Sequence, residues 1–254
     1  MKKYVAICIM AIGLYALQPP SWEMCGEIHP NVTRVYDLVE TPNGVLIAGT
    51  NYAPPSGTVY YIWRSTDGGN TWSYCNLPNV AINCYDLELT SSGRVYAICC
   101  APASGSDVRI FYSDDDGQTW SELPQPRVPL GRIFTTWIVG DIGIKYHNGK
   151  LYVWGPVNSP PYSPGGPYFH AELWYYDEAS FQWNKWDILT QHGFTIEKGP
   201  GPQAGQTYLY LGTSGPTGAA KVIRLNQPIG NLQNKNLSKE STMKNFDINP
   251  PRER

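Results

Sequence analysis

The sequence predicts an all-β fold, a β-propeller of about four four-stranded blades. An eight-residue pattern, S-x-D-x-G-x-T-W, occupies residues 65–72 and returns 48 positions later at residues 113–120. A second pattern, Tyr-Asp-Leu followed by a turn that ends in Gly, occupies residues 36–44 and returns 49 positions later at residues 85–93. Repeat units of about 50 residues with four short strands each are typical of propeller blades.

Residues 1–17 are predicted to be a signal peptide or an N-terminal membrane anchor. Lys2 and Lys3 precede an apolar run over residues 4–17. This run has the length of a signal-peptide core, whereas a membrane-spanning helix needs about 20 apolar residues. We therefore expect a secreted or extracytoplasmic protein that contacts a membrane only if this segment stays uncleaved.

The propeller is predicted over residues 18–225, and it begins with an isolated outer strand. Residues 22–25, Trp-Glu-Met-Cys, mirror residues 72–75, Trp-Ser-Tyr-Cys, and each segment is followed by Asn-Val and then by Tyr-Asp-Leu. Trp22 is therefore expected to start an outer strand without a unit of its own. Such a strand could complete the last blade and close the ring.

The first two units share one plan. In each, an alternating run meets a turn that ends in Gly, a second apolar run follows at residues 45–49 or 95–99, and a Pro-, Ser- and Gly-rich loop precedes the hairpin with the eight-residue pattern. The Asp of this pattern can accept bonds from amides of its own turn, and the Gly supplies a positive φ.

This hairpin pattern resembles the Asp-box, or BNR repeat, of sialidases, sortilin-type receptors, some glucanases and photosystem assembly factors. In those families the box lies at outer hairpins of propeller blades, away from the active face. The resemblance implies a propeller of the sialidase and sortilin superfamily in which the box residues are structural: Ser65, Asp67, Gly69, Thr71, Trp72, Ser113, Asp115, Gly117, Thr119 and Trp120.

The later units are degenerate. In the third, residues 176–183 keep the Asp and the terminal Trp of a box but lose its Gly, and in the fourth no outer strand follows residues 221–225. A four-bladed ring closed by the N-terminal strand, a ring completed by a second chain and a fifth blade all stay open. Residues 226–254 are polar and are expected to form a flexible tail.

Composition and motifs exclude several classes of function. The 254 residues carry a formal net charge of −2 and no run of Lys or Arg, so a nucleic acid partner is not expected. The sequence contains no phosphate-binding loop, dinucleotide fingerprint, nucleophile elbow or pair of His at metal-ligand spacing, so we expect no cofactor and no metal. Buried thiols and one or two disulfides both stay open for the five cysteines beyond the leader: Cys25, Cys75, Cys84, Cys99 and Cys100.

Binding is expected on the face opposite the box turns, at the loops between the second and third strands. The third of these loops is the longest, and its prolines stiffen it, so Tyr162, Tyr168 and Phe169 are the candidate binding residues for a glycan or a protein ligand. The alternative is that Tyr168 and Phe169 begin the next strand and pack in the sheet. All four loops are rich in Pro, Ser and Gly: 51–58, 101–107, 155–170 and 213–219.

Catalysis is the less favoured hypothesis. The resemblance implies that a sialidase would need an Arg-Ile-Pro motif ahead of the first box, but the similar Arg-Val-Pro at residues 127–129 follows both boxes. Another glycosidase would need only two carboxylates about 5–9.5 Å apart. Asp37 and Asp86, at equivalent positions on two inner strands, are weak candidates, although a repeated Tyr-Asp-Leu is also explained by blade packing.

Three functional hypotheses follow from the sequence. The first is an exported, non-catalytic propeller that binds a glycan or a protein through its loop face. The second is a glycoside hydrolase, sialidase-like or other, that uses the inner-strand carboxylates. The third is a structural surface protein that completes its ring by oligomerisation.

Overall fold

The computed structural model confirms the all-β prediction. It describes residues 23–51, 61–78, 83–100, 108–127, 130, 142–156, 171–190, 192–200, 206–214 and 220–224. These residues form antiparallel strands and the turns between them, with almost no helix. The strands fall into four consecutive sets, which are named units 1 to 4.

Units 1 and 2 contain four strands each, in the order that the sequence predicts. Strands pair with their chain neighbours within each unit, and a bridge between Asn51 and Asn83 joins the two units into one sheet. The strands are β1 (Arg34–Glu40), β2 (Leu46–Asn51), β3 (Ile62–Ser65), β4 (Ser73–Tyr74), β5 (Asn83–Leu89), β6 (Val95–Cys100), β7 (Val108–Ser113) and β8 (Ser121–Glu122).

Units 3 and 4 form separate sheets. Unit 3 has four strands, and the described part of unit 4 has three, so its outermost described strand pairs on one side. The strands are β9 (Gly143–His147), β10 (Lys150–Pro156), β11 (Ala171–Asp177), β12 (Gln182–Thr190), β13 (His192–Pro200), β14 (Thr207–Ser214) and β15 (Ala220–Arg224).

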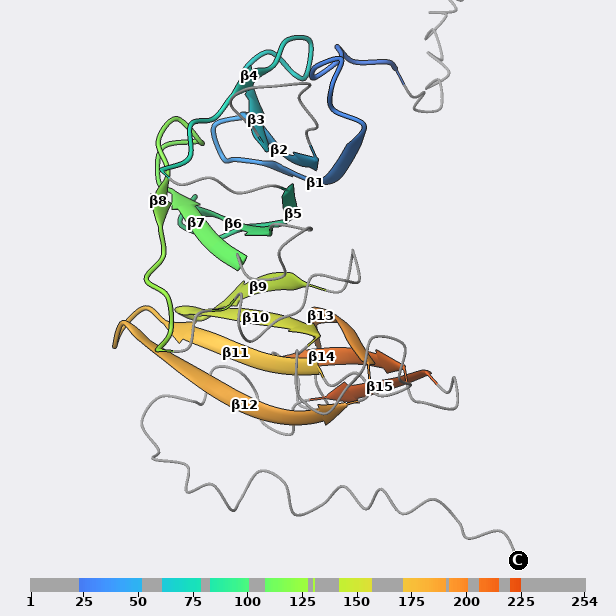
Figure 1. Ribbon diagram of the computed structural model, residues 1–254, viewed down its shortest axis with the longest axis vertical. Helices are drawn as coiled ribbons and strands as arrows, with labels where there is room; N and C mark the ends of the chain where they lie inside the picture. The colour runs from blue at the N-terminus through green and yellow to red at the C-terminus, as the bar shows by residue number, and fades with distance from the viewer. Residues whose placement is uncertain are drawn as a thin grey trace, which may run out of the picture.

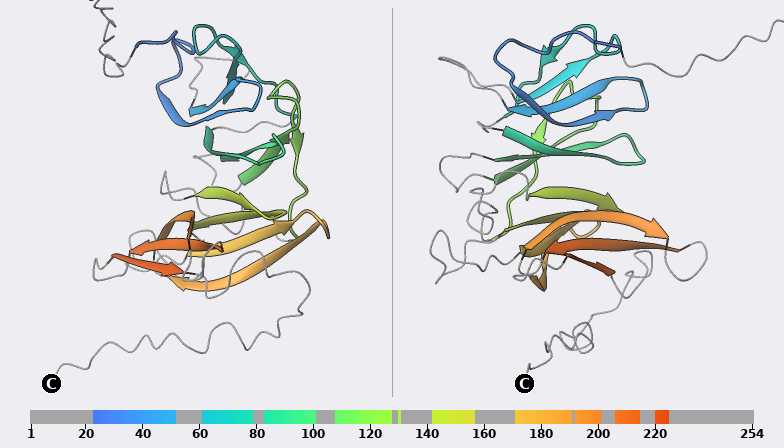
Figure 2. Two further views of the ribbon diagram at one scale, coloured as in Figure 1. Left: turned by 180° about the vertical axis from the view of Figure 1, so that it is seen from behind. Right: turned by 90° about the vertical axis from the view of Figure 1, so that its right-hand side faces the viewer.

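The four units follow one another in chain order as a curved stack (Figure 1). Unit 1 and unit 4 lie at opposite ends of this stack in every view (Figures 1 and 2). The N-terminal residues 23–33 form no strand, and they lie against unit 1, where Gly26 N donates to Gly69 O at 2.9 Å. Trp22 lies outside the described residues, so the predicted closing strand is not seen on unit 4.

Turn chemistry accounts for the first hairpin of each of the first three units. Gly44, Gly93 and Gly149 have φ of 76°, 90° and 75°, a left-handed conformation that glycine adopts without steric cost. In the first two hairpins the strands are closed by Thr41 N donating to Val45 O and by Thr90 N donating to Arg94 O. The Gly-ended turns of the sequence therefore determine where the second strands begin.

A bulge recurs on the inner strands at the Tyr-Asp-Leu pattern. The pairing register shifts between Val35 and Asp37 in β1 and between Cys84 and Asp86 in β5. A bulge adds a residue to one strand and re-aims the side chains that follow it. Asp37 and Asp86 therefore both follow a bulge at the equivalent position of their inner strands.

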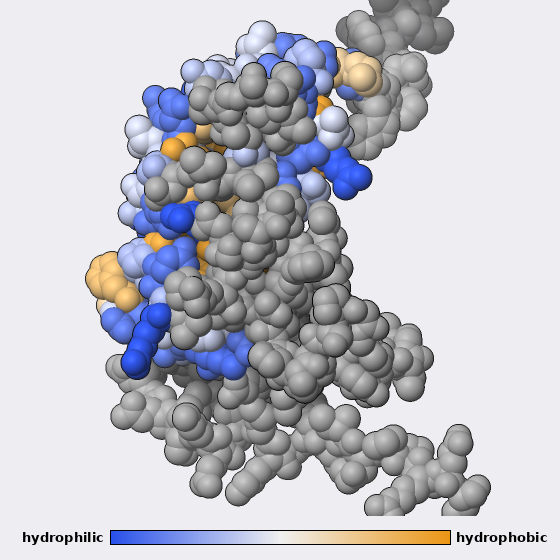
Figure 3. All heavy atoms as spheres, viewed as in Figure 1, coloured by the Kyte–Doolittle hydropathy of each residue, from blue (hydrophilic) through white to orange (hydrophobic). Residues whose placement is uncertain are grey.

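Apolar side chains fill the spaces between neighbouring units, and the described outer surface is largely hydrophilic (Figure 3). Units 1 and 2 bury Ile47, Ile62, Leu87, Phe111 and Trp120 between them. Units 2 and 3 bury Tyr96, Ile98, Ile110, Ile144 and Val153. Units 3 and 4 bury Tyr152, Trp154, Leu173, Ile196 and Leu209.

Replacing Gly143 by Ala is expected to destabilise the protein. A Cβ at Gly143 would lie 2.3 Å from Cζ2 of Trp154 and 2.8 Å from Oδ2 of Asp86. Because overpacking in a filled interior costs about 1–3 kcal/mol, the free energy of unfolding should fall by that amount in chemical denaturation. Gly149→Asn is the control, since its Cβ would meet open space and Asn tolerates positive φ. Equal stability of the two variants would contradict the prediction.

Candidate functional site

The predicted binding residues Tyr162, Tyr168 and Phe169 lie outside the described part of the chain. The described strands show where their loop is anchored: it leaves from Pro156 at the end of β10 and returns at Ala171 at the start of β11. The two anchors of the loop are therefore known.

The loops after β2, β6 and β10 leave their units at the end opposite the box hairpins. In each unit the second strand runs antiparallel to the third, and the box or box-like hairpin joins the third strand to the fourth. The hairpin consequently lies beside the start of the second strand. The strand ends that carry the loops, at Asn51, Cys100 and Pro156, lie at the other end.

The first Asp-box is a turn held by its own side chains. The Thr71 amide and hydroxyl donate to Oδ1 and Oδ2 of Asp67 at 2.9 and 2.6 Å, and Gly69 N donates to Ser65 Oγ at 2.9 Å. Trp72 Nε1 donates to Gly69 O at 3.0 Å. The hydrogen bonds from Thr71 and Ser65 lower the pKa of Asp67 to about 2, as expected for a carboxylate that accepts several bonds.

The second Asp-box repeats these bonds. The Thr119 amide and hydroxyl donate to Asp115 at 2.8 and 2.6 Å, Gly117 N donates to Ser113 Oγ at 2.9 Å, and Trp120 Nε1 donates to Gly117 O at 3.1 Å. Both box aspartates therefore serve as turn acceptors. Their carboxylate oxygens are engaged within the turn, so they are poor candidates for acid–base chemistry.

Asp37 connects unit 1 to unit 2. Its Oδ2 accepts a hydrogen bond from Leu87 N on β5 at 2.8 Å, and its Oδ1 accepts one from Leu38 N on its own strand at 2.8 Å. The bulge before Asp37 turns the side chain toward the neighbouring inner strand. One carboxylate thus satisfies a backbone donor in each of two units.

Asp86 repeats the connection between unit 2 and unit 3. Its Oδ2 accepts a hydrogen bond from Ile144 N on β9 at 2.8 Å. Burial, and after it the neighbouring carboxyl group of Asp37, raise the pKa of Asp86 to about 7 against the opposing hydrogen bond from Ile144 N. Asp86 therefore keeps its proton up to about neutral pH.

The contact between Asp37 and Asp86 differs from the carboxylate pair of a glycosidase. In such enzymes the two groups stand about 5–9.5 Å apart because the sugar, or the sugar and a water, fits between them. Here each group accepts a backbone amide of the next unit, and Asp37 lies near enough to Asp86 to raise its pKa. The structure brings the two weak catalytic candidates together, but in a geometry that suits joining units rather than cleaving a glycoside.

Glu88, which the sequence analysis did not single out, joins three units. Its side chain is buried, and Oε1 accepts Tyr146 N on β9 at 2.9 Å and Lys198 Nζ on β13 at 3.3 Å. Oε2 lies 3.4 Å from Lys145 Nζ. The sequence offered a signal for Glu88, because it stands two positions after Asp86 and alternate residues of a strand share a face.

A second polar cluster joins units 2 and 3 at the end of the sheets that carries the box turns. Arg94 binds Asp114 at 2.7 Å and Glu178 at 2.8 Å, and Tyr146 donates its hydroxyl to Glu178 at 2.6 Å. Tyr96 also donates to Glu178. Asp114, which stands beside the second box, is therefore an ion-pair partner, and Glu178 is satisfied by an Arg and two Tyr hydroxyls.

The described residues show no metal-binding group of three or more His, Cys, Asp or Glu side chains. The five cysteines within the described ranges are free thiols; Cys25 is exposed, and Cys75, Cys84, Cys99 and Cys100 are buried. Burial raises the pKa of Cys75 to about 12. Such a buried thiol is inert at neutral pH, because thiolate formation would require a charge in an apolar setting.

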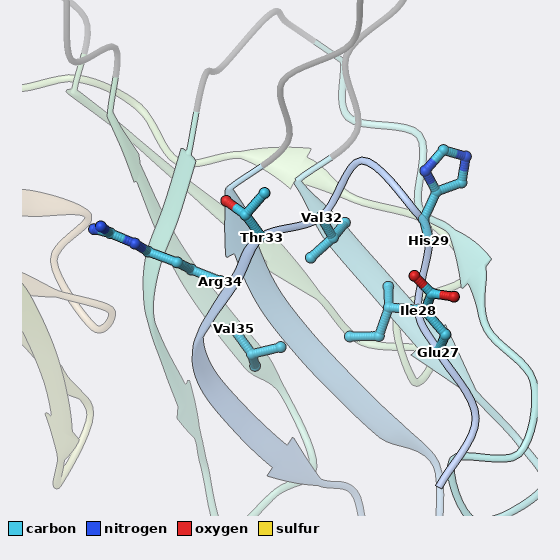
Figure 4. A pocket seen from close by; sticks show the side chains of 7 residues that line it. All are labelled: Glu27, Ile28, His29, Val32, Thr33, Arg34 and Val35. Carbon is cyan, nitrogen blue, oxygen red and sulfur yellow. The ribbon is translucent and has the colours of Figure 1, made fainter.

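One shallow hollow, of about 170 Å³, lies between the N-terminal segment and the start of β1 (Figure 4). Apolar side chains of Ile28, Val32 and Val35 line it together with Glu27, while the Arg34 side chain extends away from it (Figure 4). Its volume is below the usual range of about 300–1,000 Å³ for ligand pockets. No helix among the described residues has the length and hydrophobicity that a membrane span requires.

Comparisons with known proteins leave the family of this chain open. No family model and no curated protein matches the sequence. Solved structures with a similar fold include a protein of unknown function from Dyadobacter fermentans, at 14% identity and TM-score 0.46 over 74% of this chain and 59% of the other.

An α-L-arabinofuranosidase from Fusarium graminearum in complex with an iminosugar inhibitor is similar at 17% identity and TM-score 0.45, over 76% of this chain and 67% of the enzyme. A sialidase from Trypanosoma rangeli is similar at 14% identity and TM-score 0.44, over 72% of this chain and 30% of the enzyme. At these identities and scores the likeness identifies neither a family nor an activity for this chain.

Replacing Asp86 by Asn is expected to remove a pH dependence of stability. Because folding raises the pKa of Asp86 from 3.8 to about 7, its stabilising contribution is complete below about pH 4 and is lost as the pH rises through about 7. Asn stays neutral and can still accept the Ile144 amide. The variant should therefore exceed the wild type in free energy of unfolding at about pH 8, by up to about 4 kcal/mol, and match it near about pH 4.

Denaturant titrations at these two pH values check the prediction. Asp177→Asn is the control of opposite sign. Burial acts to raise the pKa of Asp177, but the hydrogen bond from Lys150 acts against burial and the pKa of Asp177 is lowered. Its contribution is present at neutral pH and is lost in acid. A destabilised Asp86→Asn variant at about pH 8 would show that the negative charge of Asp86, rather than its hydrogen bonds, stabilises the fold.

Proposed function

We propose that this chain is an exported, non-catalytic module of the Asp-box propeller type that binds a glycan through the loops after its second strands. The observation that supports this most is the use of the inner-strand carboxylates. Asp37, Asp86 and Glu88 all accept backbone amides of the next unit. The acids that a hydrolase would place in the channel are occupied in holding the units together.

The scaffold beneath the loops is suited to presenting ligand contacts. All six residues of β6 are buried, and residues 151–154 of β10 are buried as well, so two of the loops leave from fully packed strands. Prolines in residues 157–170 restrict that loop further. Aromatic side chains on a stiff loop bind with little loss of conformational entropy, which favours Tyr162, Tyr168 and Phe169 as contacts to sugar rings.

The propeller, its Asp-box resemblance and its export are parts of the same proposal. The equivalent hydrogen bonds in the two box turns support the Asp-box resemblance, and the repeated connection from inner strand to inner strand supports a propeller-like arrangement of units. Residues 1–17 support export. A glycan ligand is consistent with an extracytoplasmic location.

A glycoside hydrolase is the second candidate, and one observation favours it. The pKa of Asp86 is raised by burial and by Asp37 to about 7, which is where a general acid acts efficiently at neutral pH. For this activity the protonated Asp86 would need to leave Asp37 and reach a glycosidic oxygen.

A glycan array with the full chain, with product release from the bound sugars followed in parallel, tests the proposal. We expect saturable binding without product. Tyr162→Ala and Tyr168→Ala should each weaken binding by about tenfold, which corresponds to about 1.4 kcal/mol. Phe181→Ala is the control, because Phe181 is an exposed aromatic on the β11–β12 hairpin at the opposite end of the unit.

Two outcomes would contradict the proposal. Product release that Asp86→Asn abolishes would establish the hydrolase. Absence of binding to any glycan would shift the ligand to the protein class.

A further inference from the structure

The two ends of the curved stack carry exposed apolar side chains. Of the six large hydrophobic residues that are most exposed in the described part of the chain, four lie at the unit 1 end: Met24 at 98%, Val35 at 51%, Leu38 at 51% and Tyr74 at 47% exposure. A fifth, Val222, is 74% exposed on β15 in unit 4. Isolated exposed side chains are ordinary, but these gather at the two surfaces where the series of units stops.

The outward face of unit 1 has the same design as a face that unit 2 buries. Leu38 and Trp63 are aligned across β1, β2 and β3 as Leu87 and Phe111 are aligned across β5, β6 and β7. Leu87 and Phe111 are buried against unit 1. Leu38 has no unit in front of it in the described structure and stays half exposed, whereas Trp63 is buried beside His29 of the N-terminal segment. The face therefore has the composition of an interface between units, and the N-terminal segment covers part of it.

The hydrogen bonds of the inner strands show the same gap. Leu87 N donates to Asp37 of the preceding unit, whereas the equivalent Leu38 N donates to Asp37 of its own strand. The amide that a preceding unit would bind is therefore satisfied locally. Unit 1 is built as a unit that follows another one.

Units 1 to 3 all end with an outer strand of one pattern, a Trp followed three positions later by an apolar residue: residues 72–75, 120–123 and 183–186. In the first two units the amide of that last residue binds the third strand, with Cys75 N donating to Ile62 O and Leu123 N donating to Ile110 O, both at 2.8 Å. The described part of unit 4 has no such strand.

Residues 22–25, Trp-Glu-Met-Cys, carry the pattern of an outer strand. Yet residues 23–25 form no strand, and both Met24 and Cys25 are exposed. Residues 23–25 therefore have the sequence of an outer strand but pair with no strand in the described part of the chain. The sheet of unit 4 has an edge at β15 that pairs with no strand in the part that the structure describes.

The bulges align unit 4 with unit 1. The first pair after the bulge is Asp37 with Gly49 in unit 1 and Thr195 with Gly212 in unit 4. On the next strand Gly49 stands opposite Ile62, and Gly212 stands opposite Val222. Val222 therefore occupies the position of Ile62.

Two positions further along the third strand, Arg224 occupies the position of Arg64. In unit 1 the outer strand places Ser73 opposite Arg64. Transferred to β15, this register places Glu23 opposite Arg224 and Cys25 beside Val222. Glu23 and Arg224 are exposed and opposite in charge. The register of the other units therefore places a negative side chain opposite a positive one at this edge.

We propose that β15 of one copy of this chain receives residues 23–25 of a second copy as its outer strand, and that the outward face of unit 1 of the second copy packs on unit 4 of the first. In each copy, Gly26 binds Gly69 and so holds the end of this segment on unit 1 of the same chain. In that chain β15 lies at the opposite end of the stack (Figures 1 and 2). A second copy can therefore supply the strand that a single chain keeps at the other end of its stack. Such head-to-tail contacts close into a ring or extend as a chain of copies.

Cross-linking tests the register. In Val222→Cys, oxidised glutathione should join Cys25 of one copy to the introduced thiol at position 222 of the next by converting two thiols to one disulfide, with two molecules of reduced glutathione released. We expect covalent multimers on a non-reducing gel and a linked peptide that contains both positions. Phe181→Cys is the matched control, because Phe181 is equally exposed but lies on the β11–β12 hairpin, and it should give no link to Cys25. Cys25→Ser should abolish the product.

Mixing charge variants tests whether the contact joins two copies. Glu23→Lys and Arg224→Glu each place like charges at the contact, so each alone should assemble several-fold more weakly in light scattering. In a one-to-one mixture, the introduced lysine of one variant can face the introduced glutamate of the other, and the native Glu23 can face the native Arg224 at the alternate contact. The mixture should therefore restore the mass of the wild-type assembly. Both positions are exposed, so neither change removes a buried contact.

Three results would overturn the inference. A wild-type protein with the mass of one chain would do so, as would a disulfide between positions 25 and 222 within a single chain. The third is a failure of the mixture to restore assembly when both single variants have lost it.

Discussion

Hydrogen bonds from an inner-strand amide to the carboxylate of the preceding unit are the interaction on which the arrangement of this protein depends. A four-stranded sheet satisfies its own backbone, but nothing in a single sheet sets its position relative to the next. Asp37 on Leu87 N and Asp86 on Ile144 N supply that position at a buried, directional contact. The apolar residues between units then pack in one register, because a buried amide without its acceptor would cost about 1–3 kcal/mol.

These carboxylates explain several features that otherwise look unrelated. The bulge at Tyr36 and Tyr85 re-aims each Asp along the stack, and Gly143 leaves the space in which the Asp86 carboxyl reaches Ile144. Asp86 holds a proton near neutral pH because it is buried beside Asp37. A raised pKa of a buried carboxyl group often marks a functional site, but here burial at a junction between units and the neighbouring Asp37 account for it.

The same contacts separate scaffold from function. The acids of the box turns and of the inner strands are engaged with backbone amides, and the Arg94 cluster holds units 2 and 3 at the box end. The proposed ligand binding uses the other end of the sheets, where β2, β6 and β10 finish and the Pro-rich loops begin. The ends of the stack are a different kind of surface, with exposed apolar side chains and, in the described part of unit 4, a strand edge without a partner strand.

Local sequence patterns predict the all-β class, the repeat of about 50 residues and the hairpin turns, because these depend on local rules: Gly at positive φ, Asp bonding its own turn and alternation along a strand. The sequence placed Asp37 and Asp86 at equivalent positions but left their role open between packing and catalysis. The amides that the two carboxylates accept follow from the tertiary structure, because Leu87 and Ile144 lie 50 and 58 residues further along the chain. Glu88 and Glu178 escaped notice for the same reason, because each binds groups from units that local sequence patterns do not bring together.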